Sequence, residues 1–347
     1  IYFILSLRYL FFKMTLKKIV FSLIPILVII SITEIYLLLK KPNFTQLDKH
    51  LGWKLKSNFN HIYTQKNLKG TQYKVNFSTN EYGLRHFITN QNEIENVKIF
   101  VIGDSFTSDP YASNDLMWYS EIAKKISKDF KKNVLVHSMG AGGYGNFQQL
   151  LQLRELKKTG YNFENITFFI FQYCNNDLQN NSISIEKKLK NYNQYSRRPY
   201  LINNQIFYDD SLLLKILRIP FIGESRILNK IFFLLSKVSM HNLEIQKQDY
   251  EKSIQITKNI INLIQKELNK KTLMINCNIN NNWPFNFIND IASENNFYYL
   301  NYPKNIKTDE NNFFEDGSHL SEVGNKFLGS YLYDEIVNND LLEYLIN

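Results

Sequence analysis

Short runs of hydrophobic residues recur along residues 97–347, and each run ends in glycine or polar residues. Runs without strict alternation are typical of strands that are buried on both faces of a sheet. The stretches between the runs place apolar residues at helical spacing, which predicts helices. The expected strands cover residues 98–103, 133–138, 166–173, 272–276 and 297–300. The expected helices cover residues 115–127, 147–158, 247–269 and 321–337.

Strands that alternate with helices indicate a parallel sheet with helices on both faces. We therefore expect the α/β class, as a three-layer α/β/α, flavodoxin-like sandwich over residues 97–347. An insertion at about residues 180–241 separates the third and fourth strands. Within it, PYLINNQIFYDD predicts a hairpin, whereas residues 212–238 are apolar with helical spacing. That apolar stretch is interpreted as a lid, a membrane-apposed patch or extra core, and the choice stays open.

Residues 42–96 precede this domain and are polar and aromatic, with several turn signals. Residues 58–65 and 73–78 read as strands joined by a loop around Gly70. We therefore expect a small β-rich entry segment ahead of the sandwich.

Residues 19–39, IVFSLIPILVIISITEIYLLL, are apolar on every face. At about 1.5 Å per residue, such a helix is about as long as a bilayer's hydrocarbon core is thick. We predict a single transmembrane anchor within residues 1–41, uncleaved because no small-x-small site follows the run. Its N-terminus would lie inside, and the rest of the chain would be periplasmic or extracellular. Met14, followed by TLKK, would make a natural start, so residues 1–13 are interpreted as an extension of the reading frame.

The formal net charge of +9 raises nucleic acid as a partner. The lysines are scattered, however, and no basic stripe or nucleic-acid motif is present, so we expect no nucleic-acid partner. The sequence contains neither a CxxC pair nor HExxH, and no metal or other cofactor is expected. Cys174 and Cys277 end neighbouring strands if the third and fourth strands pair, within reach of a disulfide. Parallel neighbours often point their side chains past each other, so a free pair stays the alternative.

Unusual residues follow the carboxyl ends of the predicted strands, where open parallel sheets bind ligands. Ser105 follows the first strand, Gly143 the second and Asn176 the third, and Asp316 and His319 lie in a loop after the fifth. A serine nucleophile needs an adjacent base, histidine serves near neutral pH, and an acid fixes the histidine tautomer. Glycine allows close backbone approach, and asparagine offers an N–H donor to an oxyanion. The pattern indicates cleavage of an ester.

These segments, in this order, resemble the four sequence blocks of the SGNH (GDSL-like) hydrolase superfamily. GDSF resembles the nucleophile block, GGYG the glycine block, NND the asparagine block and DGSH the block with the acid and base. The third block usually carries a glycine before its asparagine, and Cys174 and Asn175 occupy that stretch here. The segments LGW, NEYGLR and RPY are also similar to a membrane-anchored subgroup.

The resemblance implies Ser105 as nucleophile, His319 as general base and Asp316 as the acid that orients it. It implies an oxyanion hole formed by the backbone N–H groups of Ser105 and Gly143 with the side chain of Asn176. We expect an esterase that forms an acyl-enzyme from an O-acyl ester, on a lipid or an acylated envelope glycan. An O-acyltransferase acting on an envelope polysaccharide and a non-catalytic glycan-binding module are the alternatives.

Overall fold

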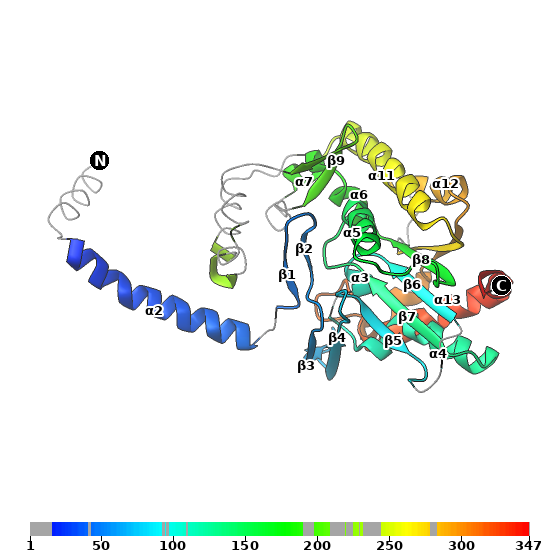
Figure 1. The fold of residues 1–347 in the computed structure, drawn as a ribbon, viewed down its shortest axis with the longest axis horizontal. Coiled ribbons are helices and arrows are strands. Elements are labelled where there is room, and N and C mark those ends of the chain that lie inside the picture. The colour runs from blue at the N-terminus through cyan, green and yellow to red at the C-terminus, as the bar shows by residue number, and fades with distance from the viewer. Residues whose placement is uncertain are drawn as a thin grey trace.

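A central sheet contains six strands among the residues that the structure describes (Figure 1). The strands lie across the sheet in the order β12-β11-β8-β6-β7-β5. Their bounds are β5 (Arg85–Ile88), β6 (Val97–Ile102), β7 (Val134–Met139), β8 (Phe168–Tyr173), β11 (Thr272–Asn276) and β12 (Tyr298–Asn301). The computed structural model describes residues 16–40, 43–91, 94, 97–108, 110–189, 198–208, 219, 225–228, 230–231, 244–277 and 283–346.

The strands β6, β7, β8, β11 and β12 pair in parallel. Numbered 1 to 5 in chain order, they lie across the sheet in the order 2-1-3-4-5. This order is that of flavodoxin-like sheets, as predicted. The strand β5 was not predicted, and it adds an antiparallel edge in which Arg85 pairs with Ser138 and Ile88 with Leu135. The segment interpreted as an entry region therefore contributes a strand to the central sheet.

Helices cover both faces of the sheet and enclose two hydrophobic cores. Alternate residues of β8 face opposite cores, with Phe168 and Ile170 in one and Phe169 and Phe171 in the other. Burying each such side chain contributes about 1.5–3 kcal/mol. One face is covered by α4 (Trp118–Phe130), α13 (Glu322–Asn338) and α14 (Leu341–Ile346), the other by α5 (Asn146–Lys158), α11 (Lys247–Leu268) and α12 (Phe287–Glu294). Shorter elements are α3 (Ser105–Ser108), η1 (Asn114–Leu116), η3 (Lys304–Thr308) and η4 (Glu310–Asn312).

Two antiparallel hairpins precede β5. The second agrees with the alternation seen in the sequence, because exposure alternates residue by residue along its first strand. Its turn contains Gly70 with φ of +83°, a conformation that favours glycine. The hairpins are β1 (Thr45–Asp48) with β2 (Gly52–Leu55), and β3 (Asn60–Lys66) with β4 (Gln72–Ser78). A third core joins them to the loop after β7 and consists of Leu51, Leu55, Val75, Phe77, Ala141 and Tyr144.

The hairpin predicted within the insertion is present as β9 (Pro199–Ile202) and β10 (Gln205–Tyr208). Asn203 and Asn204 join the strands with φ of 50° and 60°, as a type I′ turn requires. The short helices α6 (Asn175–Asn180) and α7 (Ile183–Lys188) precede this hairpin. Residues 1–13 with Met14, and most of the apolar stretch over residues 212–238, lie outside the described residues.

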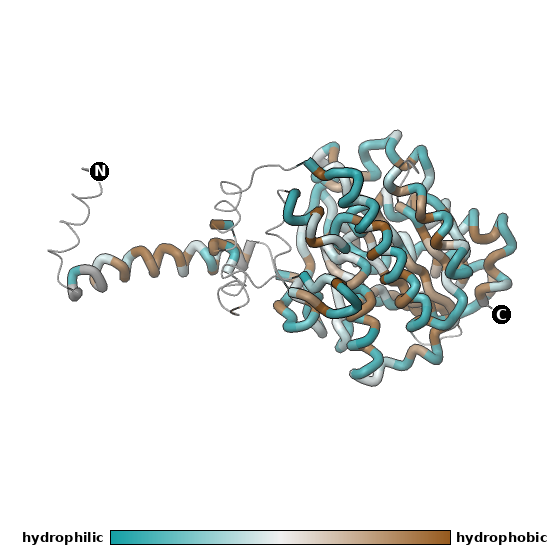
Figure 2. The backbone as a smooth tube through the Cα atoms, turned by 90° about the horizontal axis from the view of Figure 1, so that it is seen from above, coloured by the Kyte–Doolittle hydropathy of each residue, from teal (hydrophilic) through white to brown (hydrophobic). Residues whose placement is uncertain are grey.

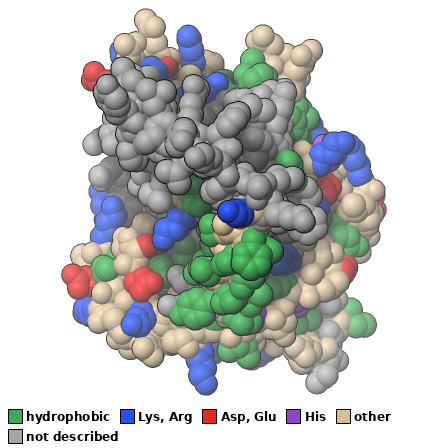
Figure 3. All heavy atoms as spheres, turned by 90° about the vertical axis from the view of Figure 1, so that its left-hand side faces the viewer, with side chains coloured by type: hydrophobic (Ala, Val, Ile, Leu, Met, Phe, Trp, Pro, Cys, Tyr) green, Lys and Arg blue, Asp and Glu red, His purple; other side chains and the backbone are tan. Residues whose placement is uncertain are grey.

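The helix α2 (Leu16–Lys40) extends away from the α/β body (Figures 1 and 2). Its apolar side chains are largely exposed, with Phe21 at 77% and Leu27 at 59%. Figure 3, viewed from the side on which α2 lies, shows hydrophobic side chains gathered there. No helix in the described part of the chain is long and apolar enough to cross a membrane. The transmembrane anchor predicted over residues 19–39 is therefore not supported.

A carboxylate within α2 binds the insertion. Glu34 accepts hydrogen bonds from the backbone N–H groups of Arg226 (2.7 Å) and Ile227 (3.1 Å). The hydroxyl of Ser225 donates to the same carboxylate at 3.0 Å. These bonds outweigh the effect of partial burial, which by itself raises the pKa of Glu34, and they hold that pKa below its usual value.

Candidate active site

Ser105 is the first residue of α3 and is separated from the end of β6 only by Gly103 and Asp104. The strand β6 lies between β7 and β8, where the order of the parallel strands reverses. Ligands bind outside the carboxyl ends of the strands at this point of an open α/β sheet. The backbone is so tightly packed here that a Cβ on Gly140 (φ +147°) would lie only 2.3 Å from the carbonyl oxygen of Gly103. Glycine at position 140 therefore lets the loops after β6 and β7 approach each other.

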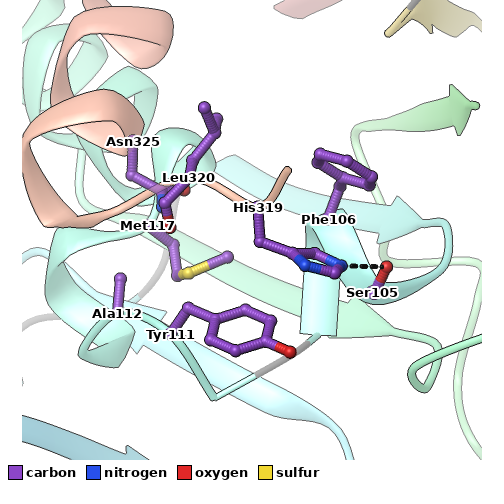
Figure 4. A pocket seen from close by; sticks show the side chains of 8 residues that line it. All are labelled: Ser105, Phe106, Tyr111, Ala112, Met117, His319, Leu320 and Asn325. Atoms are coloured by element: carbon purple, nitrogen blue, oxygen red, sulfur yellow. Dashed lines mark hydrogen bonds between the residues drawn. The ribbon is translucent and has the colours of Figure 1, made fainter. Parts of the chain in front are cut away.

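A continuous chain of hydrogen bonds links Ser105, His319 and Asp316. The Ser105 hydroxyl and His319 Nε2 are 2.9 Å apart, and Figure 4 shows the imidazole directed toward this hydroxyl. His319 Nδ1 lies 2.5 Å from Asp316 Oδ2 on the other side of the ring. The structure thus brings the serine of the first predicted block together with the acid and base of the last. Their arrangement is that of a nucleophile, a base and an orienting acid.

The backbone around Asp316 holds its carboxylate in place. Asp316 Oδ1 accepts hydrogen bonds from the backbone N–H groups of Ser318 (2.8 Å) and His319 (2.9 Å), so Oδ2 is directed to the imidazole. Partial burial by itself raises the pKa of Asp316. The hydrogen bonds from the side chain and backbone of His319 and from Ser318 outweigh it and hold the pKa well below its usual value. Asp316 is therefore ionised at neutral pH and favours a proton on His319 Nδ1.

Two aromatic rings flank the His319 imidazole (Figure 4). The ring of Phe106 lies 5.0 Å from it and that of Tyr111 lies 4.6 Å from it, both tilted by about 30°. Tyr111 belongs to no motif, so no signal in the sequence pointed to it. A small pocket adjoins the imidazole and is lined by Ser105, Phe106, Tyr111, Ala112, Met117, His319, Leu320 and Asn325.

Asn176 lies at the start of α6, beside the residue that precedes the serine. Its side-chain Nδ2 donates to Asp104 Oδ2 at 2.7 Å. Asp104 is buried, which raises its pKa, while the hydrogen bond from Asn176 opposes the rise. Asp177 accepts a bond from the backbone N–H of Cys174 at 2.8 Å and holds the start of α6. The sheet thus places the third predicted block next to the first.

Gly143 lies in a tight loop after β7 with φ of +75°, a conformation that favours glycine. The neighbouring carbonyl of Gly142 accepts a bond from the Trp53 indole at 3.1 Å, and the Tyr144 hydroxyl donates back to the Trp53 carbonyl at 2.5 Å. Asn180 Nδ2 donates to the Gly143 carbonyl at 3.3 Å. The glycine loop is therefore fixed from two sides, by β2 and by α6.

Cys174 and Cys277 form a disulfide, with 5.0 Å between their Cα atoms. This confirms the disulfide hypothesis, and the third and fourth predicted strands, β8 and β11, pair as that hypothesis requires. Cys174 stands two residues before Asn176, so the disulfide ties this segment to the end of β11. Among the residues that the structure describes, no group of three or more His, Cys, Asp or Glu side chains could hold a metal ion.

No protein-family model matches the chain, and no curated protein matches it. Several solved structures are similar to it. A lipase/acylhydrolase from Enterococcus faecalis is 15% identical with a TM-score of 0.38, over 70% of this chain and 96% of that chain. The psychrotrophic esterase EstA from a Pseudoalteromonas species is 11% identical with a TM-score of 0.40, over 70% and 97%. A lipase from a goat rumen metagenome is 13% identical with a TM-score of 0.32, over 68% and 95%.

Proposed function

We propose that this protein is a serine hydrolase that cleaves carboxylic (O-acyl) esters through an acyl-enzyme. The hydrogen-bonded chain from Ser105 through His319 to Asp316 is the observation that carries the proposal. A serine hydroxyl is a weak nucleophile on its own, and a histidine within hydrogen-bond distance activates it. The position of Ser105 at the reversal of the strand order supports the same assignment.

In this mechanism the Ser105 oxygen attacks the acyl carbon while His319 Nε2 takes the hydroxyl proton. The ester C–O bond then breaks, and His319 returns the proton to the departing alcohol. Water attacks the acyl-enzyme, His319 takes a proton from it, and the free acid leaves as Ser105 regains its proton. Asp316 holds the imidazole and stabilises its protonated form throughout, as its lowered pKa allows.

The oxyanion that forms on the carbonyl oxygen when Ser105 attacks needs hydrogen-bond donors. We assign these to the backbone N–H groups of Ser105 and Gly143 and to the side chain of Asn176. The bond from Asn176 to Asp104, the residue directly before Ser105, supports the assignment because it fixes the amide beside the nucleophile. Loss of one such donor costs about a hundredfold to a thousandfold in rate.

The proposed substrate is an O-acyl ester of a lipid or an envelope glycan. The side chains of His319 and Asp316 keep 20% and 32% of their surface exposed, which supports access by a large ester. The disulfide between Cys174 and Cys277 supports a periplasmic or extracellular location, because disulfides persist in oxidising compartments. No metal or other cofactor takes part in the proposed steps.

Labelling with a fluorophosphonate tests the proposal, because this reagent reacts with activated serines. We expect a single adduct on the Ser105 peptide and turnover of a small acyl ester such as p-nitrophenyl acetate. Ser105→Ala should abolish both while the protein stays folded. Ser293→Ala, at an exposed position of α12, is the matched control and should leave both unchanged. Undiminished turnover by Ser105→Ala would overturn the proposal.

A further inference from the structure

Two loops that are distant in the sequence meet at the His319 ring. Residues 110–114 bring Tyr111 against the imidazole, and residues 313–319 carry the histidine itself. Both loops contact the hairpin formed by β3 and β4, which belongs to the entry segment. The contacts between this hairpin and the two loops are numerous and specific.

The hairpin holds the first loop through side chains. The Tyr73 hydroxyl donates to the carbonyl oxygen of Tyr111 at 3.0 Å. The hydroxyl of Tyr63 and the amide of Gln65, at 3.3 Å, both donate to the carbonyl oxygen of Pro110. Gln65 and Tyr73 are cross-strand partners, and Tyr63 lies two residues from Gln65, so the three side chains leave the same face of the hairpin.

The end of the hairpin holds the second loop through backbone bonds. Leu68 donates its N–H to the carbonyl of Phe313 at 2.9 Å, and Glu315 donates to the carbonyl of Lys66 at 3.2 Å. These bonds form a β-bridge between Asn67 and Phe314. The loop that carries the catalytic acid and base is thus an extension of the hairpin.

The two loops also bind each other. Within the loop that carries the histidine, Phe314 donates its N–H to the carbonyl oxygen of His319 at 2.8 Å, which holds Phe314 beside it. Across the two loops, the rings of Phe314 and Tyr111 lie 4.4 Å apart, so Tyr111 contacts both His319 and a second residue of the histidine's loop. A path of direct contacts therefore runs from Tyr73 through Tyr111 to the imidazole.

We propose that the β3–β4 hairpin positions the general base, and that Tyr111 and Tyr73 are positioning residues for His319. The inference rests on the proposed function for the step in which the base takes part. The Tyr111 and Phe106 rings restrict rotation of the imidazole, so that Nε2 stays directed at the Ser105 hydroxyl. Tyr73 donates a hydrogen bond to the backbone of Tyr111 and so fixes the distance between the Tyr111 ring and the His319 imidazole.

The size of the effect follows from geometry. General-base catalysis needs a hydrogen-bonded distance and direction, and a displacement of about 1 Å costs on the order of a hundredfold. The loop of His319 has no place in the central sheet, and Asp316 binds only one edge of the imidazole. Hydrogen bonds at Nδ1 and Nε2 hold the two edges of the imidazole, and the ring can still turn about the line between them unless its faces are covered.

The test compares Tyr111→Ala with Tyr111→Phe, which keeps the ring. Four quantities are measured for each variant: kcat and KM on p-nitrophenyl acetate, the rate of fluorophosphonate labelling, the melting temperature and the proton NMR resonance of His319 Nδ1–H. We expect Tyr111→Ala to lower kcat and the labelling rate about ten- to a hundredfold and to shift or broaden the resonance. KM should change by no more than about twofold, because substrate binding is not the affected step. Tyr111→Phe should keep kcat within about threefold of wild type.

Tyr73→Phe removes one hydroxyl and serves as the milder variant if Tyr111→Ala does not fold. It should slow labelling about fivefold, as the loss of one hydrogen bond predicts. The matched control is Ile62→Thr on the same hairpin, where the isoleucine is 62% exposed on the opposite face, and it should change nothing but the melting temperature.

A labelling rate and a His319 resonance that do not change in Tyr111→Ala and Tyr73→Phe would overturn the inference and leave the proposed function intact. Failure of the wild type to label at Ser105 would instead overturn the proposed function. The NMR comparison would then still decide whether the hairpin orients His319, because it requires no turnover.

Discussion

The nucleophile side and the base side of the candidate site are built in different ways. Ser105 and Asn176 follow β6 and β8, two neighbouring strands buried in the centre of the sheet. Asp316 and His319 lie in a loop outside the sheet and are partly exposed. The nucleophile side is therefore rigid because of the sheet itself. The base side depends on contacts with a hairpin some 240 residues earlier in the chain, such as Asn67 with Asn311.

This difference shows how a strand-end site is completed. A parallel sheet brings the ends of its strands together without further help, since neighbouring strands lie about 4.8 Å apart. A loop after the last strand has no such guide, and its conformational entropy must be offset by contacts from elsewhere. Substitutions on the nucleophile side should therefore alter the chemical step, whereas substitutions that disturb the contacts of the base side should alter the orientation of His319.

The largest expected effect is on the base side, in Asp316→Asn. The amide can keep its oxygen on the backbone N–H groups of Ser318 and His319, which places its NH₂ against His319 Nδ1. The imidazole then carries its proton on Nε2 and cannot accept one from Ser105, so kcat should fall about ten-thousandfold. Steady-state kinetics on an acyl ester measure this, with Glu315→Gln as the adjacent control. A loss below about tenfold would contradict the assigned role of Asp316.

On the nucleophile side, Asn176→Ala should lower kcat about a hundredfold or more with little change in KM, because an oxyanion donor acts in the transition state. The rate of fluorophosphonate labelling should fall with it. The His319 Nδ1–H resonance should stay in place, because the base side is not touched. A shifted resonance would show that the two sides are not independent.

The disulfide offers a third way to disturb the nucleophile side. The double variant Cys174→Ser with Cys277→Ser opens a cross-link between residues 103 positions apart. The free energy of unfolding should fall by about 2–4 kcal/mol. Denaturant titration measures the loss, and the wild type in a strong reductant should match the variant. The loss of kcat should stay below that of Asn176→Ala, because the amide and Asp104 are both retained. Equal stability with and without the bond would refute this.

The last prediction concerns a buried cluster behind the glycine loop and a change of stability with pH. Arg198 donates to Glu186 at 3.1 Å and to Gln148 at 2.5 Å, and Gln148 in turn accepts from the backbone of Gly145 at 3.3 Å. Burial raises the pKa of Glu186 to about 7, although Arg198 and the Tyr200 hydroxyl oppose the rise.

The folded protein therefore holds a proton on Glu186 that the unfolded chain releases above its ordinary pKa of 4.5. The contribution of Glu186 to the free energy of unfolding should fall as pH rises from about 4.5 to about 7, by at most about 1.4 kcal/mol per pH unit. Glu186→Gln should remove this slope. Urea titrations at several pH values compare the two proteins, and identical slopes would contradict the prediction.

Much of the sheet and of the nucleophile side could be predicted from local pattern. The strand over residues 272–276 was predicted with the bounds that the structure shows, because its hydrophobic run is short and sharply ended. The edge strand β5 was missed, because RHFI is too short and too polar at its start to stand out as a strand. The predicted anchor over residues 19–39 rested on the apolar content and the length of the run, and it found no support.

The sequence by itself determined which residues stand at the ends of the parallel strands, and so placed Ser105 and Asn176 together. It also placed Asp316 three positions from His319, close enough for one loop to join them. Only the tertiary structure decided how that loop is held, because Tyr73 and Tyr111 belong to no motif and meet across 38 positions of the chain. It alone decided the pairing of Cys174 with Cys277, which depends on β8 and β11 being neighbours. Periodicity reports the burial of a local segment, whereas contacts between distant segments depend on how those segments pack.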